Sequence, residues 1–228
     1  MTFLVSAALL LRLRLPSRVA SEASTSFWRD FVAGWDEFRS RTWVWLMVVH
    51  WSLLLLFAEA PLDVLGPVTA RRSLGGPASW GAIEAGFALG LFGGRLVAAR
   101  CSPARPMFAS AIALLAAAPA YALLASGAWI PFIVLSRFVA GLSFTLYGTL
   151  WTTTLQQLVP ADRLSRVTSY EWLGSMAFMP LGYVLAGPAA GGFGISPVLW
   201  FSSGWVVVST VFVIFRRSVR SLRSPSAL

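Results

Sequence analysis

Residues 195–215 read ISPVLWFSSGWVVVSTVFVIF, and none of these 21 residues is charged. Four arginines follow within eight positions, at Arg216, Arg217, Arg220 and Arg223. An α-helix rises about 1.5 Å per residue, so this run can cross the roughly 30 Å of hydrocarbon in a bilayer. An uncharged run of this length beside a basic flank is typical of a transmembrane helix.

Further apolar runs precede this one, bounded by Arg, Gly or Pro, at residues 42–65, 80–99, 107–126, 129–155 and 167–190. Of the 228 residues, 57% are hydrophobic and 12% charged, and the mean hydropathy is +0.72. A single water-soluble core cannot cover that much apolar surface. The sequence therefore predicts an all-α membrane protein with six transmembrane helices over residues 42–215.

The arginines predict the orientation of these helices. Fifteen of them lie before the first run, in the second and fourth connections and in the tail at 216–228, whereas the alternate connections hold only Arg71 and Arg72. Loops rich in arginine stay in the cytoplasm. We therefore expect a multi-pass protein of the cell membrane with both ends in the cytoplasm.

Several function classes are disfavoured. The net charge is +9, but the arginines lie between apolar runs and not on one face, so we expect no nucleic-acid partner. Cys101 and His50 are the only residues of their types, and no metal motif is present, so we expect neither a metal nor another cofactor. Ser143 has no identifiable base, and we expect no enzyme activity.

Two segments precede the six helices. Residues 1–15 hold an apolar run too short to span, which we interpret as the remnant of a truncated transmembrane helix. A signal peptide is the alternative, but the two arginines here follow the apolar run and do not precede it. Residues 16–41 form a cytoplasmic linker with an amphipathic helix, whose aromatic stripe at 28–38 fits either the inner leaflet or the protein itself.

Ionisable residues inside the apolar runs are candidates for function, because a charge in hydrocarbon needs a partner or a water-filled cavity. Glu59 and Asp63 lie four residues apart around Pro61, which should bend the helix. Two carboxylates this close can share a proton, which makes them proton-coupling candidates. Alternatively, Asp63 is solvated at the interface and only Glu59 is embedded.

Arg137 lies near the middle of its helix. It either lines a substrate path or forms an ion pair with Glu171 or with a carboxylate from outside the chain. Tyr147 and Trp151, together with Trp51, are candidates for an adaptable aromatic cavity. Glu171 belongs to the same predicted pathway, or it is a first-turn acid stabilised by its helix N-terminus.

Small residues recur at two places. Gly86, Gly90 and Gly94 form a stripe on one helix, which predicts close packing against another helix. The predicted fifth helix ends in the GPxxGG string formed by Gly187, Pro188, Gly191 and Gly192 with two alanines.

This string resembles the antiporter motif of the major facilitator superfamily. Residues 150–171 resemble the tenth-to-eleventh helix region of its macrolide and enterobactin exporters, and residues 94–105 resemble its cytoplasmic loop motif. Ala99 stands where that motif carries an aspartate, so its gating salt bridge is not carried over.

The resemblance implies the C-terminal six-helix half of a twelve-helix transporter, which binds a small-molecule substrate between two halves. A six-helix N-terminal half is then the expected partner. Proton-coupled efflux of amphipathic molecules such as drugs or siderophores is the implied function. The alternative is a non-transporting membrane protein, including an inert remnant of a truncated transporter gene.

The orientation gives a first testable prediction. Epitope tags fused to the two ends should both be hidden from antibody in intact cells and become accessible after permeabilisation, because the arginine-rich segments stay inside. Detection of one tag, but not the other, on intact cells would refute an even number of spans.

Overall fold

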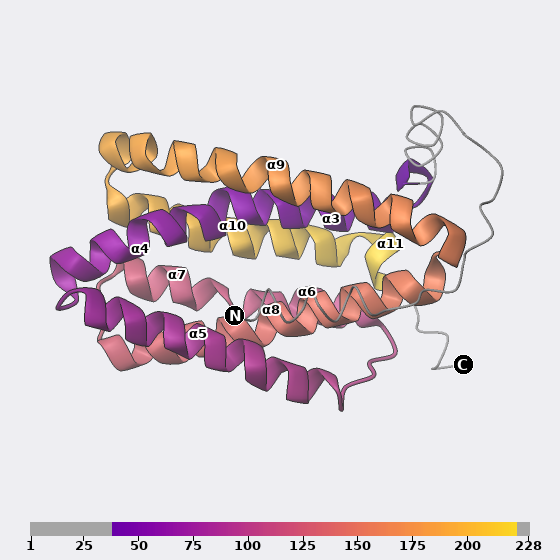
Figure 1. Cartoon of the computed structure of the whole chain (residues 1–228), viewed down its shortest axis with the longest axis horizontal. Coiled ribbons are helices and arrows are strands. Elements are labelled where there is room, and N and C mark those ends of the chain that lie inside the picture. The colour runs from indigo at the N-terminus through magenta and orange to yellow at the C-terminus, as the bar shows by residue number, and fades with distance from the viewer. Residues whose placement is uncertain (1–37, 223–228) are drawn as a thin grey trace, which may run out of the picture.

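The computed structural model describes residues 38–222, except for the side chains at 161–163, 166, 175 and 176. The truncated helix predicted within 1–15, and residues 16–37 of the linker predicted at 16–41, lie outside the described residues. In the described part every regular element is a helix (Figure 1). The elements are α3 (Thr42–Leu54), the π-helix η1 (Leu55–Glu59), α4 (Ala60–Ser73), α5 (Pro77–Ala98), α6 (Pro106–Leu115), α7 (Ala118–Ala125), α8 (Ile130–Leu158), α9 (Ala161–Phe193), α10 (Ile195–Phe215) and α11 (Arg217–Arg220).

Six of the described helical stretches are long and apolar enough to cross a membrane, which confirms the predicted number: Thr42–Ser73, Pro77–Ala98, Pro106–Ala125, Ile130–Leu158, Val167–Phe193 and Ile195–Phe215. The first extends eight residues beyond the predicted end. Thr69 and Ser73 donate side-chain hydrogen bonds to carbonyl oxygens one turn back, at 2.8 and 2.9 Å, so polar residues continue the helix. It stops where Gly75 and Gly76 adopt positive φ.

The predicted disturbance at Pro61 takes the form of a π-helix in the turn before it. Proline has no backbone N–H and crowds the preceding turn, and a wider π turn accommodates that loss. Glu59, the last residue of η1, is buried with 6% of its surface exposed. The third span is likewise divided into α6 and α7 just before Pro119.

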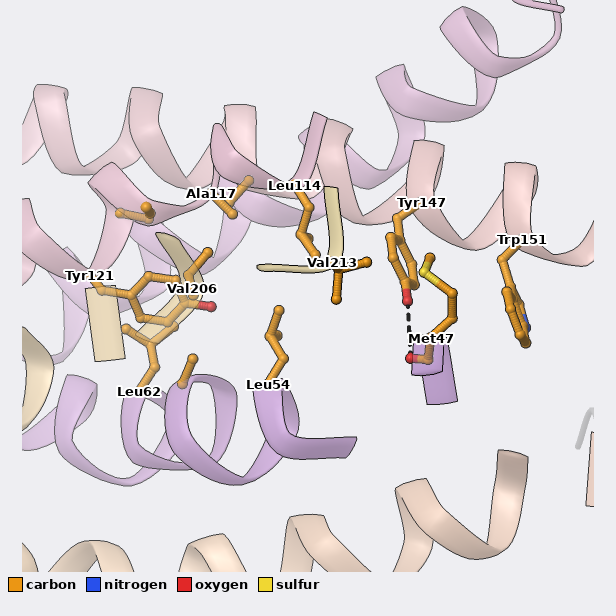
Figure 2. Packing of buried hydrophobic residues seen from close by; sticks show 14 of the residues in the cluster. Met47, Leu54, Leu62, Leu114, Ala117, Tyr121, Tyr147, Trp151, Val206 and Val213 are labelled. Carbon is orange, nitrogen blue, oxygen red and sulfur yellow. Dashed lines mark hydrogen bonds between the residues drawn. The ribbon is translucent and has the colours of Figure 1, made fainter. Parts of the chain in front are cut away.

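The helices pair in a definite pattern. The first span, α3–η1–α4, packs against α9 and α10, while α5 packs mainly against α8, and the third span contacts α8 and α10. As a result α5 and α9 lie at opposite edges of the bundle in Figure 1. Side chains from the central helices fill the core, including Met47, Leu54, Leu114 and Val206 (Figure 2).

The glycine stripe on α5 faces α8. A Cβ atom on Gly86 would lie 2.8 Å from the carbonyl oxygen of Val134, and one on Gly90 would overlap the carbonyl of Phe138. A Cβ on Gly94 would lie 2.7 Å from the Cβ of Thr145. The absence of side chains at these positions therefore lets the two backbones approach closely.

The GPxxGG string has a different environment. Gly187, Pro188, Gly191 and Gly192 are exposed on the last turns of α9, and a Cβ on any of these three glycines would meet nothing within 4 Å. The glycines of the string therefore form an open surface on this part of α9.

His50 connects the first span to the last span by a hydrogen bond. Its side chain is 4% exposed, and Nε2 lies 3.2 Å from the hydroxyl oxygen of Thr210 on α10. The side chain of His50 is therefore buried and hydrogen-bonded. At one end of the bundle, Arg41 donates a 2.9 Å hydrogen bond to the carbonyl of Leu158, so the start of the first span lies beside the end of α8.

The stripe gives a stability prediction with a control on the same helix. Gly90→Ala should destabilise the protein by about 1–3 kcal/mol, because the added methyl group forces α5 away from α8. Gly81→Ala should be neutral or slightly stabilising, because a Cβ there meets nothing within 4 Å. Unfolding of the detergent-solubilised protein measures both, and equal stability of the two variants would contradict close α5–α8 packing.

Candidate functional site

Four residues from different helices meet in what we call the charge cluster: Glu59, Glu84, Tyr121 and Arg137. Arg137 on α8 is 1% exposed, and its Nη2 lies 3.0 Å from Oε1 of Glu84 on α5. Its Nη1 lies 3.9 Å from Oε1 of Glu59. The hydroxyl of Tyr121 on α7 donates to the same carboxylate oxygen of Glu59.

Arg137 therefore has two carboxylate partners, and the suggestion that it pairs with Glu171 is wrong. The guanidinium also lies over the ring of Phe87, 4.1 Å from its centroid. A charge at this depth requires such compensation, since hydrocarbon does not solvate it. The sequence held a usable signal for Glu84: it and Arg137 each lie seven residues after the start of helices that begin at the same end of the bundle.

Glu59 and Asp63 have different partners. Glu59 points into the charge cluster, whereas the exposed Asp63 accepts a 2.9 Å hydrogen bond from the hydroxyl of Tyr183 on α9. Asp63 thus connects the first span to α9. Whether the two carboxylates exchange a proton stays a prediction.

A second group lies ten residues further along α8, about 15 Å away. Trp51 stacks on Tyr147 with ring centroids 4.9 Å apart and an interplanar angle of 14°, and Phe144 packs edge-on against Trp51 at 5.3 Å. Figure 2 shows Tyr147 and Trp151 projecting from one helix toward Met47 of α3, where the Tyr147 hydroxyl lies 3.5 Å from the Met47 carbonyl.

These rings border two adjoining cavities, which together we call the aromatic cleft. The first, of about 300 Å³, is lined from α3, α5, α8 and α9 and includes Trp51, Tyr147, Trp151 and Glu171. The second, of about 370 Å³, shares Trp51 and Glu171 and continues along α9 past Trp172. The structure thus brings together three of the residues predicted to form a pathway, Tyr147, Trp151 and Glu171.

Glu171 is the eleventh residue of α9, because that helix begins at Ala161 and not at the predicted position 167. The interpretation as a first-turn acid is therefore wrong, since the helix dipole acts only within the first turn. The carboxylate is partly buried and lies beside the indole of Trp151.

Aromatic contacts join the charge cluster to the aromatic cleft. Phe87, which lies under Arg137, packs edge-on against Phe144 with centroids 5.7 Å apart, and Phe144 contacts Trp51. A movement of the guanidinium would therefore change the packing of the rings that line the cleft.

Other candidate sites have fewer side chains that could bind a ligand or catalyse a reaction. A groove of about 580 Å³ between the first span, α9 and α10 is lined by Leu, Phe, Pro, Gly, Ala and Val, with no polar side chain to orient a ligand. The hydroxyl of Ser143 donates to the carbonyl of Val139 in its own helix. Among the described residues, no three His, Cys, Asp or Glu side chains are grouped as a metal site.

Comparison with known proteins gives no relative: neither a family model, nor a curated protein, nor a solved structure matches the chain.

The charge cluster predicts an asymmetric mutational response. Arg137→Met should destabilise the protein by about 3–5 kcal/mol, because it leaves Glu59 buried without its cation. Adding Glu59→Gln should restore part of that loss, since the double variant leaves only the partly exposed Glu84 without its cation. Unfolding in detergent measures both variants.

Arg95→Met is the matched control, because Arg95 is an exposed arginine at the end of α5. It should change stability by less than about 0.5 kcal/mol. Strictly additive effects of Arg137→Met and Glu59→Gln would show that the two side chains are not coupled.

Proposed function

We propose that the chain is the C-terminal six-helix half of a major facilitator superfamily transporter, which exports small amphipathic molecules in exchange for protons. Substrate binds in the aromatic cleft, and a second six-helix half closes the cleft from the other side. The protein lies in the cell membrane with both ends in the cytoplasm. The observation that carries this proposal is an aromatic cavity with a carboxylate at mid-membrane depth, linked to a buried ion-pair cluster.

The depth of the cleft supports a substrate site. Trp51 lies nine residues after the start of α3, and Tyr147 lies eleven residues before the end of α8. At about 1.5 Å per residue, both rings are about 14–17 Å from the same end of the bundle, well inside a roughly 30 Å hydrocarbon layer. Secondary transporters bind their substrates at this level.

The helix pairing also supports the proposal. The six spans are, in order, α3–η1–α4, α5, α6–α7, α8, α9 and α10. If the first three spans are exchanged with the last three, the contact of α5 with α8 becomes the contact of α9 with the first span. The contact of the first span with α10 likewise becomes the contact of α8 with α6–α7. Both members of each exchange are principal contacts of this bundle. Such a pattern is expected of an inverted repeat of three helices, and the aromatic cleft lies between spans one, two, four and five.

The charge cluster supplies a means of coupling. Glu59 and Glu84 compete for one guanidinium, so protonation of either carboxylate weakens its hold on Arg137. The guanidinium then shifts toward the other carboxylate and moves over Phe87, which contacts the rings of the cleft through Phe144. Proton binding and substrate binding thereby influence each other, as exchange of the two requires.

The test is export of a fluorescent amphipathic dye from cells that produce the chain with a six-helix N-terminal half. Trp51→Leu and Trp151→Leu should raise dye accumulation several-fold, because each removes a ring from the cleft. Trp200→Leu is the control, since Trp200 is exposed on α10 and lines neither cavity. Glu59→Gln should abolish the dependence of export on the proton gradient while leaving dye binding intact.

Export that is unaffected by the two cleft substitutions would refute the location of the substrate. Absence of any export, with a stable and membrane-inserted pair of halves, would favour the alternative of a non-transporting protein or inert remnant.

A further inference from the structure

Among the described residues, Glu171 differs from the other acids inside the spans in having no cationic partner and no hydroxyl donor. Glu59 and Glu84 face Arg137, and Asp63 accepts from Tyr183. Glu171 lies beside the neutral indole of Trp151, and no described arginine forms a salt bridge with it. A carboxylate at this depth is expensive to keep ionised, so an external cation would stabilise it.

The walls around Glu171 also favour positive charge. The π-faces of Trp, Tyr and Phe carry negative potential and attract cations, with tryptophan the strongest. Trp51 and Trp172 line the cleft together with the carboxylate, and Trp151 lies beside it. A ligand in the cleft therefore meets aromatic rings and one anionic group.

The same walls offer little to an anion. The hydroxyl of Thr145 already donates to the carbonyl of Leu91 at 3.0 Å, and the hydroxyl of Tyr147 points at the carbonyl of Met47. No arginine lines either cavity among the described residues. A phosphate or carboxylate ligand would therefore meet no cationic donor among the described residues that line the cleft.

We propose that the aromatic cleft selects amphipathic organic monocations, such as quaternary ammonium or phosphonium compounds. The positive centre pairs with the Glu171 carboxylate, and the apolar groups pack against Trp51, Tyr147 and Trp151. This assignment rests on the proposed function for the fate of the ligand, which is export, but the binding step depends on this chain alone.

Size and hydration favour such ligands over metal ions. Cavities of about 300 and 370 Å³ that share two lining residues have room for a cation with aromatic substituents. Calcium and magnesium need several oxygen ligands, and Glu171 is the only acid among the described residues that line the cleft. A weakly hydrated organic cation enters with a small loss of hydration.

Binding of radiolabelled tetraphenylphosphonium to the purified chain in lipid nanodiscs tests the proposal. Glu171→Gln should weaken binding about tenfold or more, because it removes a partly desolvated ion pair. Glu171→Asp, which keeps the charge, should retain most of the affinity. Triphenylphosphine oxide, a neutral compound with similar aromatic groups, should compete poorly with the wild type.

The contribution of the aromatic side chains to cation binding is tested with separate variants and controls. Trp51→Leu should weaken binding several-fold, Trp51→Phe less, and Trp200→Leu not at all, because Trp200 lies outside the cleft. A thermal unfolding curve for each variant confirms that it is folded. If Glu171→Gln does not fold, the comparison of the cation with its neutral competitor still decides the matter.

Equal affinity for the neutral compound, or full affinity in folded Glu171→Gln, would overturn the proposal. These outcomes are separate from a failure of the proposed function. Selective cation binding without export by the paired halves would refute transport and leave the site, whereas export with no selectivity for cations would refute the site and leave transport.

Discussion

The guanidinium of Arg137 must remain beside two carboxylates, because it is almost completely buried at a depth where water is scarce. Much of the local architecture serves this requirement. Glycines on α5 bring Glu84 within 3.0 Å by allowing backbone contact with α8. The π turn before Pro61 ends at Glu59, which is buried facing the same cation. A change that separates any of these helices therefore exposes an unpaired charge to hydrocarbon.

The charge cluster and the aromatic cleft divide two tasks between two levels of the bundle. The cluster contains the ion pairs, whose balance changes when a carboxylate is protonated, while the cleft contains ring faces that adapt to different apolar shapes. Phe87 and Phe144 lie between them and contact both. In the proposed transporter, this arrangement allows a charge change in the cluster to alter packing in the cleft without contact between the bound substrate and Arg137.

The number of spans could be predicted from the sequence, because an uncharged run of about 20 residues has few alternatives to crossing a bilayer. The partners of the embedded charged residues could not be predicted from the sequence, because these partners depend on which helices are neighbours. Arg137 was considered with Glu171, although Glu84 lies at the same depth on the helix that the glycine stripe brings to α8. The alternative interpretation of Glu171 as a first-turn acid was wrong because α9 begins six residues before its apolar run, in a polar first turn. The aromatic composition of the cleft was expected, but not the stacking of Trp51 on Tyr147.

The two glycine-rich surfaces differ in one informative respect. The stripe on α5 packs against α8, and Gly182 of α9 packs against the first span. A Cβ on Gly182 would lie 2.7 Å from the carbonyl oxygen of Leu56. Further along α9, Gly187 and Gly191 face open space. Small residues in a membrane helix gain stability only where another helix packs against them, since lipid chains contact larger side chains equally well. The exposed glycine surface is therefore suited to a helix from outside the described chain, and this supports the proposal that a second six-helix half completes the transporter.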